Sequence, residues 1–199
     1  MTVVKEACVD NIQDAINAFK KGADRIEFCS NLDEDGLTPS NYDLISLKKS
    51  ISIPVRVMVR PHSNSFNYND DDLIQMKETI EFCKNQKFDG VVFGCLDDND
   101  ELDFKKIKYL ADFAKPLNVI IHKAIDLTSS PVNSLKKLLE INNVNGVLSS
   151  GGCETAELGI EILKKMINIS PNEFEIISAG KITNQNFKIL HEKIDGKFS

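Results

Sequence analysis

The sequence GADRIEFCSNL, residues 22–32, decides the fold of this chain. Its central residues alternate between apolar and polar types, and in a β-strand such residues point to opposite faces. Two residues form the apolar face and three form the polar face: Ile26 and Phe28 against Arg25, Glu27 and Cys29. A helix packed on the apolar face leaves the polar face lining an interior. The stretch therefore predicts a strand with helices outside it and a polar interior on its other side.

The rest of the chain alternates between segments of strand character and segments of helical character. The other predicted strands are residues 2–8, 55–60, 90–95, 117–122, 146–149 and 174–179. The predicted helices are residues 12–19, 41–49, 70–86, 103–114, 131–141, 155–169 and 183–192. Residues 196–199 are predicted to begin a short eighth strand, with no eighth helix after it.

Strict alternation without a hairpin signal predicts parallel strands in an α/β fold. Two architectures fit this pattern, a closed (β/α) barrel and an open doubly wound sheet. Central strands of an open parallel sheet are covered on both faces and are continuously apolar. Here the second and third strands alternate apolar with charged residues, as a TIM-type barrel with a polar interior allows. We therefore predict one barrel domain over residues 1–199.

Composition limits the function classes. The chain is 42% hydrophobic and 27% charged, which is ordinary for a soluble globular protein. Its net charge of −6 and the lack of a basic stripe argue against nucleic-acid binding. No apolar run is long enough to span a membrane, and no signal-peptide pattern is present, so we expect a cytoplasmic protein. Five cysteines without close pairing suit a reducing compartment.

Arginine is used sparingly. Only three of the 24 basic residues are Arg, and all three lie in predicted strands: Arg25, Arg56 and Arg60. Arg offers a rigid, permanently charged fork that pairs with carboxylates and other anions. These residues therefore form either structural ion pairs inside the sheet or a binding site for an anionic ligand.

Two cysteines end the first two predicted strands. Cys8 and Cys29 have the same parity as the polar residues of those strands, and neighbouring parallel strands lie about 4.8 Å apart. Two thiolates at that spacing would suit Cu(I), which favours sulfur ligands. The same spacing would allow a redox disulfide. Alternatively, both are small buried residues, since a free Cys behaves as a hydrophobe.

Other candidates follow the carboxyl ends of the strands, where barrels carry their active sites. Small residues and a cation in the last loops would suit an anion: Ser150, Gly151, Gly180 and Lys181, with Arg25 and Arg60 as further donors. Candidate catalytic residues are Glu27, Arg60, His122 and Lys123. Glu27 and His122 would act as acid or base, and Lys123 would form a Schiff base. Ordinary roles exist for each, because tight turns need Gly and interior His residues are usually hydrogen-bonded.

With these residues in view, the chain resembles the CutC family of copper homeostasis proteins. The resemblance rests on motifs along nearly the whole chain: residues 5–10, 22–32, 36–40, 53–61, 89–94, 121–126 and 148–152. It implies a TIM-type barrel, a cytosolic location and self-association as a dimer or tetramer. It also implies a role in copper handling, with Cys8 and Cys29 matching the cysteines suggested as Cu(I) ligands. The chain departs from the family pattern at His62 and Lys123, where the family usually has Arg, and at Lys181, which follows Gly180 in place of a Gly-rich turn. Two expected anion-binding donors are thus altered.

Three functional hypotheses follow. The first is a cytoplasmic Cu(I)-binding protein that uses Cys8 and Cys29. The second is an enzyme acting on a small anionic substrate, for example a phosphorylated one, at the mouth of the barrel. The third is a non-catalytic scaffold whose interior charges only pair with one another. The sequence leaves open whether any reaction is catalysed.

Overall fold

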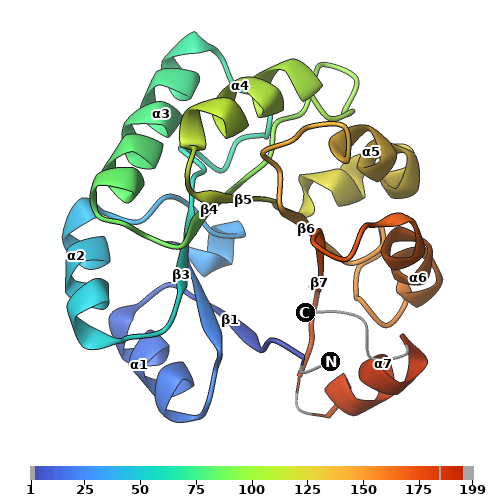
Figure 1. Cartoon of the computed structure of the whole chain (residues 1–199), viewed down its shortest axis with the longest axis horizontal. Helices are drawn as coiled ribbons and strands as arrows, with labels where there is room; N and C mark the ends of the chain where they lie inside the picture. The colour runs from blue at the N-terminus through green and yellow to red at the C-terminus, as the bar shows by residue number, and fades with distance from the viewer. Residues whose placement is uncertain (1–2, 184, 195–199) are drawn as a thin grey trace. The chain divides into compact units, whose positions relative to one another are not determined.

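The structure, a computed structural model, describes residues 3–183 and 185–194 of the 199-residue chain. Within these ranges strands alternate with helices along the chain (Figure 1). The strands are β1 (Glu6–Val9), β2 (Arg25–Phe28), β3 (Val55–Met58), β4 (Gly90–Phe93), β5 (Asn118–Ile121), β6 (Gly146–Ser149) and β7 (Glu175–Ser178). Each overlaps the strand predicted for it, so the predicted strand–helix alternation is confirmed.

Two compact units make up the chain. The N-terminal unit consists of Val4–Phe93 and Leu110–Val119 and carries β1 to β4. The C-terminal unit contains Gly94–Tyr109 and the chain from Ile120 onward, and it carries β6, β7 and the end of β5.

In the N-terminal unit β1, β2, β3 and β4 are parallel neighbours in chain order. Their register places Cys8 beside Glu27, and Glu27 beside Arg56. Residues opposite one another on neighbouring strands point to the same face of the sheet. The polar residues of β1, β2 and β3 therefore share one face.

Both faces of β2 are buried. Ile26 and Phe28 are 0% and 1% exposed, and the helix α1 (Ile12–Lys20) packs against β1 and β2. On the polar face, Arg25 and Glu27 are 8% and 3% exposed. The predicted arrangement of β2, apolar residues toward a helix and polar residues buried on the other side, is thus confirmed within this unit.

In the C-terminal unit β6 lies between β5 and β7, and both pairings are parallel. The strand begins at Gly146, where a side chain would not fit. A Cβ atom there would lie 2.7 Å from the backbone oxygen of Glu175 on β7. The close approach of the two backbones explains why glycine opens this strand.

The remaining helices also agree with the sequence prediction. They are α2 (Asn41–Ser50), α3 (Asp70–Asn85), α4 (Phe104–Ala114), α5 (Pro131–Leu138), α6 (Ile160–Ile169) and α7 (Phe187–Lys193), with 3₁₀ turns η1 (Leu32–Glu34) and η2 (Lys123–Leu127). Side-chain caps begin several of them. For example, Asn69 and Asp72 form a capping box at the start of α3.

Two helix starts were predicted wrongly. The sequence pattern places the start of α7 at residue 183, but the helix begins at Phe187. It places the start of α6 at residue 155, but that helix begins at Ile160. Just before it, Gly159 lies against the loop that follows β6. A Cβ atom at Gly159 would lie 1.8 Å from the backbone oxygen of Ser150. This tertiary contact holds the preceding residues in turns, although their composition suits a helix.

Parallel strands in an α/β fold are therefore confirmed. Closure into a TIM-type barrel and a single domain over residues 1–199 stay predictions. The predicted eighth strand, residues 196–199, lies outside the described residues.

Candidate functional site

The polar face of β1, β2 and β3 brings together four of the residues discussed above with a further acid, Glu6. We call this group the strand cluster: Glu6, Cys8, Arg25, Glu27 and Arg56. All of them lie in the N-terminal unit. In its basic half, Arg25 and Arg56 form ion pairs with Glu6. Its other half consists of the thiol of Cys8 and the carboxyl group of Glu27.

Glu6 is the anion of the basic half. Its carboxylate accepts a hydrogen bond from Nε of Arg25 and lies 3.5 Å from Nη1 of Arg56. The three side chains are 6%, 9% and 2% exposed. Arg56 also lies 3.5 Å from the carboxylate of Asp89. Two of the three arginines thus form buried structural ion pairs, as one of the two interpretations of the sequence proposed.

Cys8 and Cys29 form the thiol part of the site, and both are free. The thiol of Cys8 donates to Oε1 of Glu27 at 3.5 Å, and the thiol of Cys29 lies 3.6 Å from the backbone oxygen of Val9. The pKa of Cys8 is raised, first by a hydrogen bond with the Cys29 thiol and then by burial of its sulfur. The register of β1 and β2 thus puts both predicted thiols on the same face at neighbouring strand ends.

Glu27 is the buried acid of the cluster. Burial raises its pKa well above the ordinary value, and the neighbouring Cys8 and Glu6 raise it further. Its second carboxyl oxygen, Oε2, is buried and has no hydrogen-bond partner among the described residues. An acid in this setting keeps its proton to a higher pH than an exposed glutamate does.

Arg60 lies just after the carboxyl end of β3 and binds backbone oxygens of the surrounding loops. Its Nη1 donates to the backbone oxygens of Glu34 at 2.6 Å and Gly36 at 3.1 Å, and its guanidinium stacks 4.7 Å from the ring of Phe66. Nη2 lies 3.4 Å from the backbone oxygen of Ser63. The predicted anion donor is thus engaged mainly with the protein's own carbonyl groups.

The predicted anion loop after β6 already holds an anion of the chain itself. The carboxylate of Asp126, in η2, accepts hydrogen bonds from the backbone nitrogens of Ser150 and Gly152, each at 2.8 Å. It also accepts from the hydroxyls of Ser149 at 2.5 Å and Ser150 at 2.9 Å. This loop is the predicted anion-binding loop, but Asp126 was not among the predicted site residues. Its one signal was an acid placed after β5, whose end adjoins the loop after β6 in a parallel sheet.

The other loop candidates lie near this cradle or on the surface. Gly180 adopts φ +101° and its carbonyl accepts from the backbone of Ala156, while Lys181 pairs with the exposed Glu154. Lys181 is itself exposed. The structure thus gives Lys181 a surface ion pair with a carboxylate of its own chain.

His122 ends β5 and is 5% exposed. Its Nδ1 accepts from the backbone nitrogen of Ala124 at 3.2 Å, so the imidazole caps the turn η2. A Cβ atom on Gly94 would lie 2.8 Å from its ring, which shows how closely the ring packs on β4's exit loop. Lys123 follows it at the start of η2 and is half-buried. The catalytic roles suggested for both stay hypotheses.

At the third departure from the family pattern, Nε2 of His62 lies 3.3 Å from the carboxylate of Asp72.

Two further cysteines are core residues. Burial raises the pKa of Cys83 and that of Cys95 to about 12. At pH 8 such a thiol is ionised to the extent of about 1 in 10⁴, and the thiolate is the reactive form. We expect iodoacetamide to label Cys153, which is partly exposed, and to leave Cys83 and Cys95 unlabelled in the folded protein. Peptide mass spectrometry at timed intervals measures this. Equal labelling rates for Cys83 and Cys153 would contradict the assignment.

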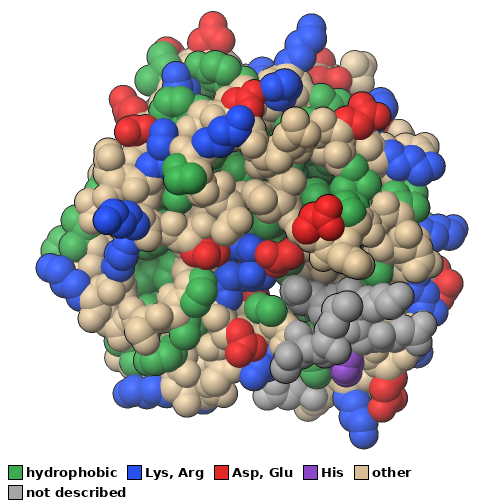
Figure 2. Space-filling model, in the orientation of Figure 1, with side chains coloured by type: hydrophobic (Ala, Val, Ile, Leu, Met, Phe, Trp, Pro, Cys, Tyr) green, Lys and Arg blue, Asp and Glu red, His purple; other side chains and the backbone are tan. Residues whose placement is uncertain are grey.

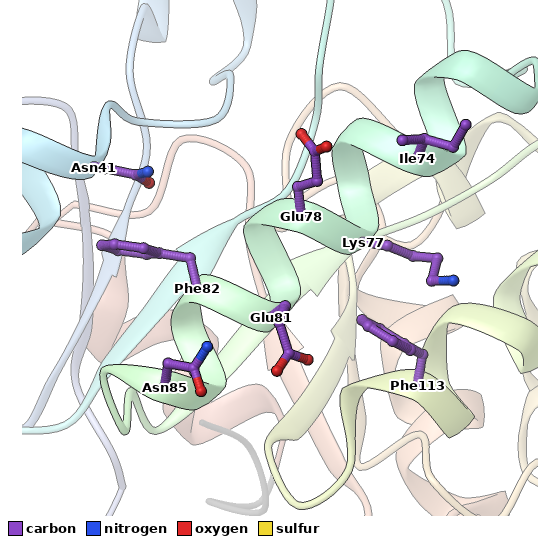
Figure 3. A pocket seen from close by; sticks show the side chains of 8 residues that line it. All are labelled: Asn41, Ile74, Lys77, Glu78, Glu81, Phe82, Asn85 and Phe113. Carbon is purple, nitrogen blue, oxygen red and sulfur yellow. The ribbon is translucent and has the colours of Figure 1, made fainter.

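A surface groove of about 580 Å³ lies elsewhere in the N-terminal unit. Figure 3 shows that α3 supplies most of its walls, with Asn41 and Phe113 at its edges. No predicted site residue lines it.

On the face drawn in Figure 2, basic and acidic side chains are interspersed. Among the described residues, no group of three or more His, Cys, Asp or Glu side chains is arranged to hold a metal ion, and no helix could cross a membrane.

Comparison with known proteins places the chain in a family. The sequence model of the CutC family matches residues 3–196. A human protein named copper homeostasis protein cutC homolog is 37% identical over 187 residues, which cover 94% of this chain and 68% of the human protein. A protein of Yersinia pseudotuberculosis named family protein CutC is 36% identical over 182 residues, which cover 90% and 71% of the two chains.

Solved structures agree. A structure named for the copper homeostasis protein CutC of Streptococcus agalactiae superposes with a TM-score of 0.90 at 27% identity and covers 99% of this chain and 97% of that chain. A phosphonomutase structure from Burkholderia cenocepacia, 12% identical with a TM-score of 0.70 over 96% and 84% of the chains, shares the fold alone. The family match and the relatives together show that this chain belongs to the CutC family of copper homeostasis proteins.

Proposed function

We propose that this chain is a cytoplasmic copper-handling protein that binds Cu(I) through the thiolates of Cys8 and Cys29. The observation that carries the proposal is the placement of these two thiols on one face at the ends of β1 and β2, where Sγ of Cys29 lies 3.6 Å from the backbone oxygen of Val9, the neighbour of Cys8. Cu(I) is a soft ion that prefers sulfur ligands and accepts as few as two of them. The family name supports the choice of metal.

The surroundings of the thiols support the same function. Both cysteines are free, as Cu(I) binding requires. Binding releases the two thiol protons and brings one positive charge, so the bis-thiolate site gains a net charge of −1. The guanidinium groups of Arg25 and Arg56, which pair with Glu6 in the same cluster, oppose this charge. Self-association as a dimer or tetramer is part of the proposal and rests on the family resemblance.

Competition titration tests the proposal. The reduced protein is titrated with Cu(I) in the presence of a chromogenic chelator of Cu(I). We expect the double variant C8S/C29S to lose at least about 100-fold in affinity, because hydroxyls are poor ligands for this soft ion. The control is C83S, which changes a buried thiol on α3 instead of one on a strand. Equal affinities of wild type and C8S/C29S would overturn the proposal.

One observation supports a second function, an enzyme that acts on a small anionic substrate. Glu27, buried with a raised pKa and an unpartnered oxygen, has the properties of a general acid for a small anionic substrate. The candidate anion donors support this function less well, because Arg25, Arg60 and the loop after β6 are engaged with the protein's own groups. Calorimetric titration with inorganic phosphate tests it, and saturable binding that is lost in E27Q would favour this function.

A further inference from the structure

A third sulfur lies on the same face as the two thiols. The register of β2 and β3 pairs Glu27 with Arg56 and Phe28 with Val57. Continuing that register by one residue places Met58 beside Cys29. Since Arg56 and Met58 are two residues apart, their side chains leave the same face of β3. Arg56 reaches Glu6 of β1 across that face, so Met58 is directed toward the thiol side of the sheet.

The backbone of Gly36 borders both sulfur-bearing side chains. A Cβ atom built on this glycine would lie 3.2 Å from Sγ of Cys29 and 3.8 Å from Cε of Met58. The thiol and the terminal methyl of the thioether therefore both pack against the same glycine. Gly36 adopts φ +82° there, a conformation that glycine takes without strain. The backbone of the loop after β2 thus passes directly over both side chains at Gly36.

From this geometry we propose that Met58 is a third ligand of the metal, so that the site binds Cu(I) through two thiolates and one thioether. This inference rests on the proposed function, because Met58 can act only where Cys8 and Cys29 bind the ion. The three side chains come from β1, from the end of β2 and from β3. Cys29 and Met58 are 0% and 5% exposed, so the proposed site is shielded from water on their side.

The chemistry of a thioether suits this position. It is a soft, neutral donor, and it adds a bond to Cu(I) without adding negative charge. The cluster already holds the carboxyl groups of Glu6 and Glu27 next to Cys8. A third thiolate would increase the repulsion among these groups, whereas methionine does not. Its unbranched side chain also reorients easily, so the sulfur can turn toward a bound ion by rotation about terminal bonds.

The alternative role of Met58 is to fill the core. A pair of matched variants separates the two roles. M58L keeps the volume and apolar character of the side chain and removes the sulfur, a change that cores usually tolerate. M76L makes the same change in α3, where the side chain of Met76 is part of the hydrophobic core and is 1% exposed. Thermal unfolding of both variants checks that they are folded.

Two measurements are made on the full chain loaded with one equivalent of Cu(I). In the competition titration, M58L should lose about tenfold in affinity for Cu(I). This is the size of loss that removing a supporting group of a metal site causes. M76L should match wild type. By copper-edge X-ray absorption, wild type and M76L should have three sulfur neighbours and M58L two. Protein labelled with selenomethionine gives a readout without any mutation, because a copper–selenium distance at bonding range identifies the thioether directly.

Each outcome decides the inference. Loss of one sulfur neighbour and of affinity in M58L alone supports it, as does a copper–selenium bond in the labelled protein. Two sulfur neighbours in wild type, with unchanged affinity in M58L, would overturn the role of Met58 and leave the two-cysteine site standing. Binding that is unaffected in C8S/C29S would overturn the proposed function and this inference together.

Discussion

Replacement of Glu6 by alanine is expected to lower the free energy of unfolding by about 3–5 kcal/mol. Glu6 is the shared partner of Arg25 and Arg56, and the three side chains are almost completely buried. Removing the carboxylate leaves guanidinium groups in the interior with less compensating charge, and the loss of a partner inside a protein is far more costly than at its surface. Urea unfolding followed by circular dichroism measures the effect.

A surface ion pair serves as the control for this prediction. Glu161 lies 3.2 Å from Lys164 in α6, and its side chain is 75% exposed. Its replacement by alanine should cost less than about 1 kcal/mol, because water screens exposed pairs. The double variant E6L/R25L should recover part of the loss by removing both charges of one pair. If E6A costs no more than E161A, the ion pairs of the strand cluster do not stabilise the fold.

Replacement of Asp126 by alanine is expected to cost about 3 kcal/mol. The carboxylate is the acceptor for two backbone nitrogens and two hydroxyls of the loop after β6. Its removal leaves the nitrogens of Ser150 and Gly152 without their acceptor. D126N should lie between wild type and D126A, since an amide keeps one acceptor oxygen but loses the charge.

Glu101 supplies the control for Asp126. It accepts a hydrogen bond from the backbone nitrogen of Ser129 at 3.1 Å, also across a loop of the C-terminal unit. Its replacement by alanine should cost about 1 kcal/mol, the net value of an ordinary hydrogen bond. Equal midpoints of urea unfolding for D126A and E101A would show that the cradle around Asp126 contributes little to stability.

The strands and their polar faces could be predicted because they depend on local patterns. Alternation in residues 22–32 identified β2, and the shared parity of Cys8 and Cys29 predicted that both thiols lie on one face. These signals are local, and the structure leaves them unchanged because the local preference and the tertiary packing agree.

The partners of the predicted residues could not be obtained in the same way. Asp126 binds a loop more than 20 residues away, and nothing in its own neighbourhood distinguishes it from an exposed acid. The same holds for Arg60, whose fork meets backbone oxygens of a loop that precedes β3. Such contacts depend on which loops meet at the strand ends, and the sequence pattern alone does not fix their geometry.

Anomalous diffraction at the copper edge, from crystals of the reduced protein loaded with Cu(I), tests the central claim most directly. We predict one strong peak within bonding distance of the sulfurs of Cys8 and Cys29. A peak at Cys153 or at the surface, with the sulfurs of Cys8 and Cys29 unliganded, would contradict the assignment of these two cysteines as the copper site.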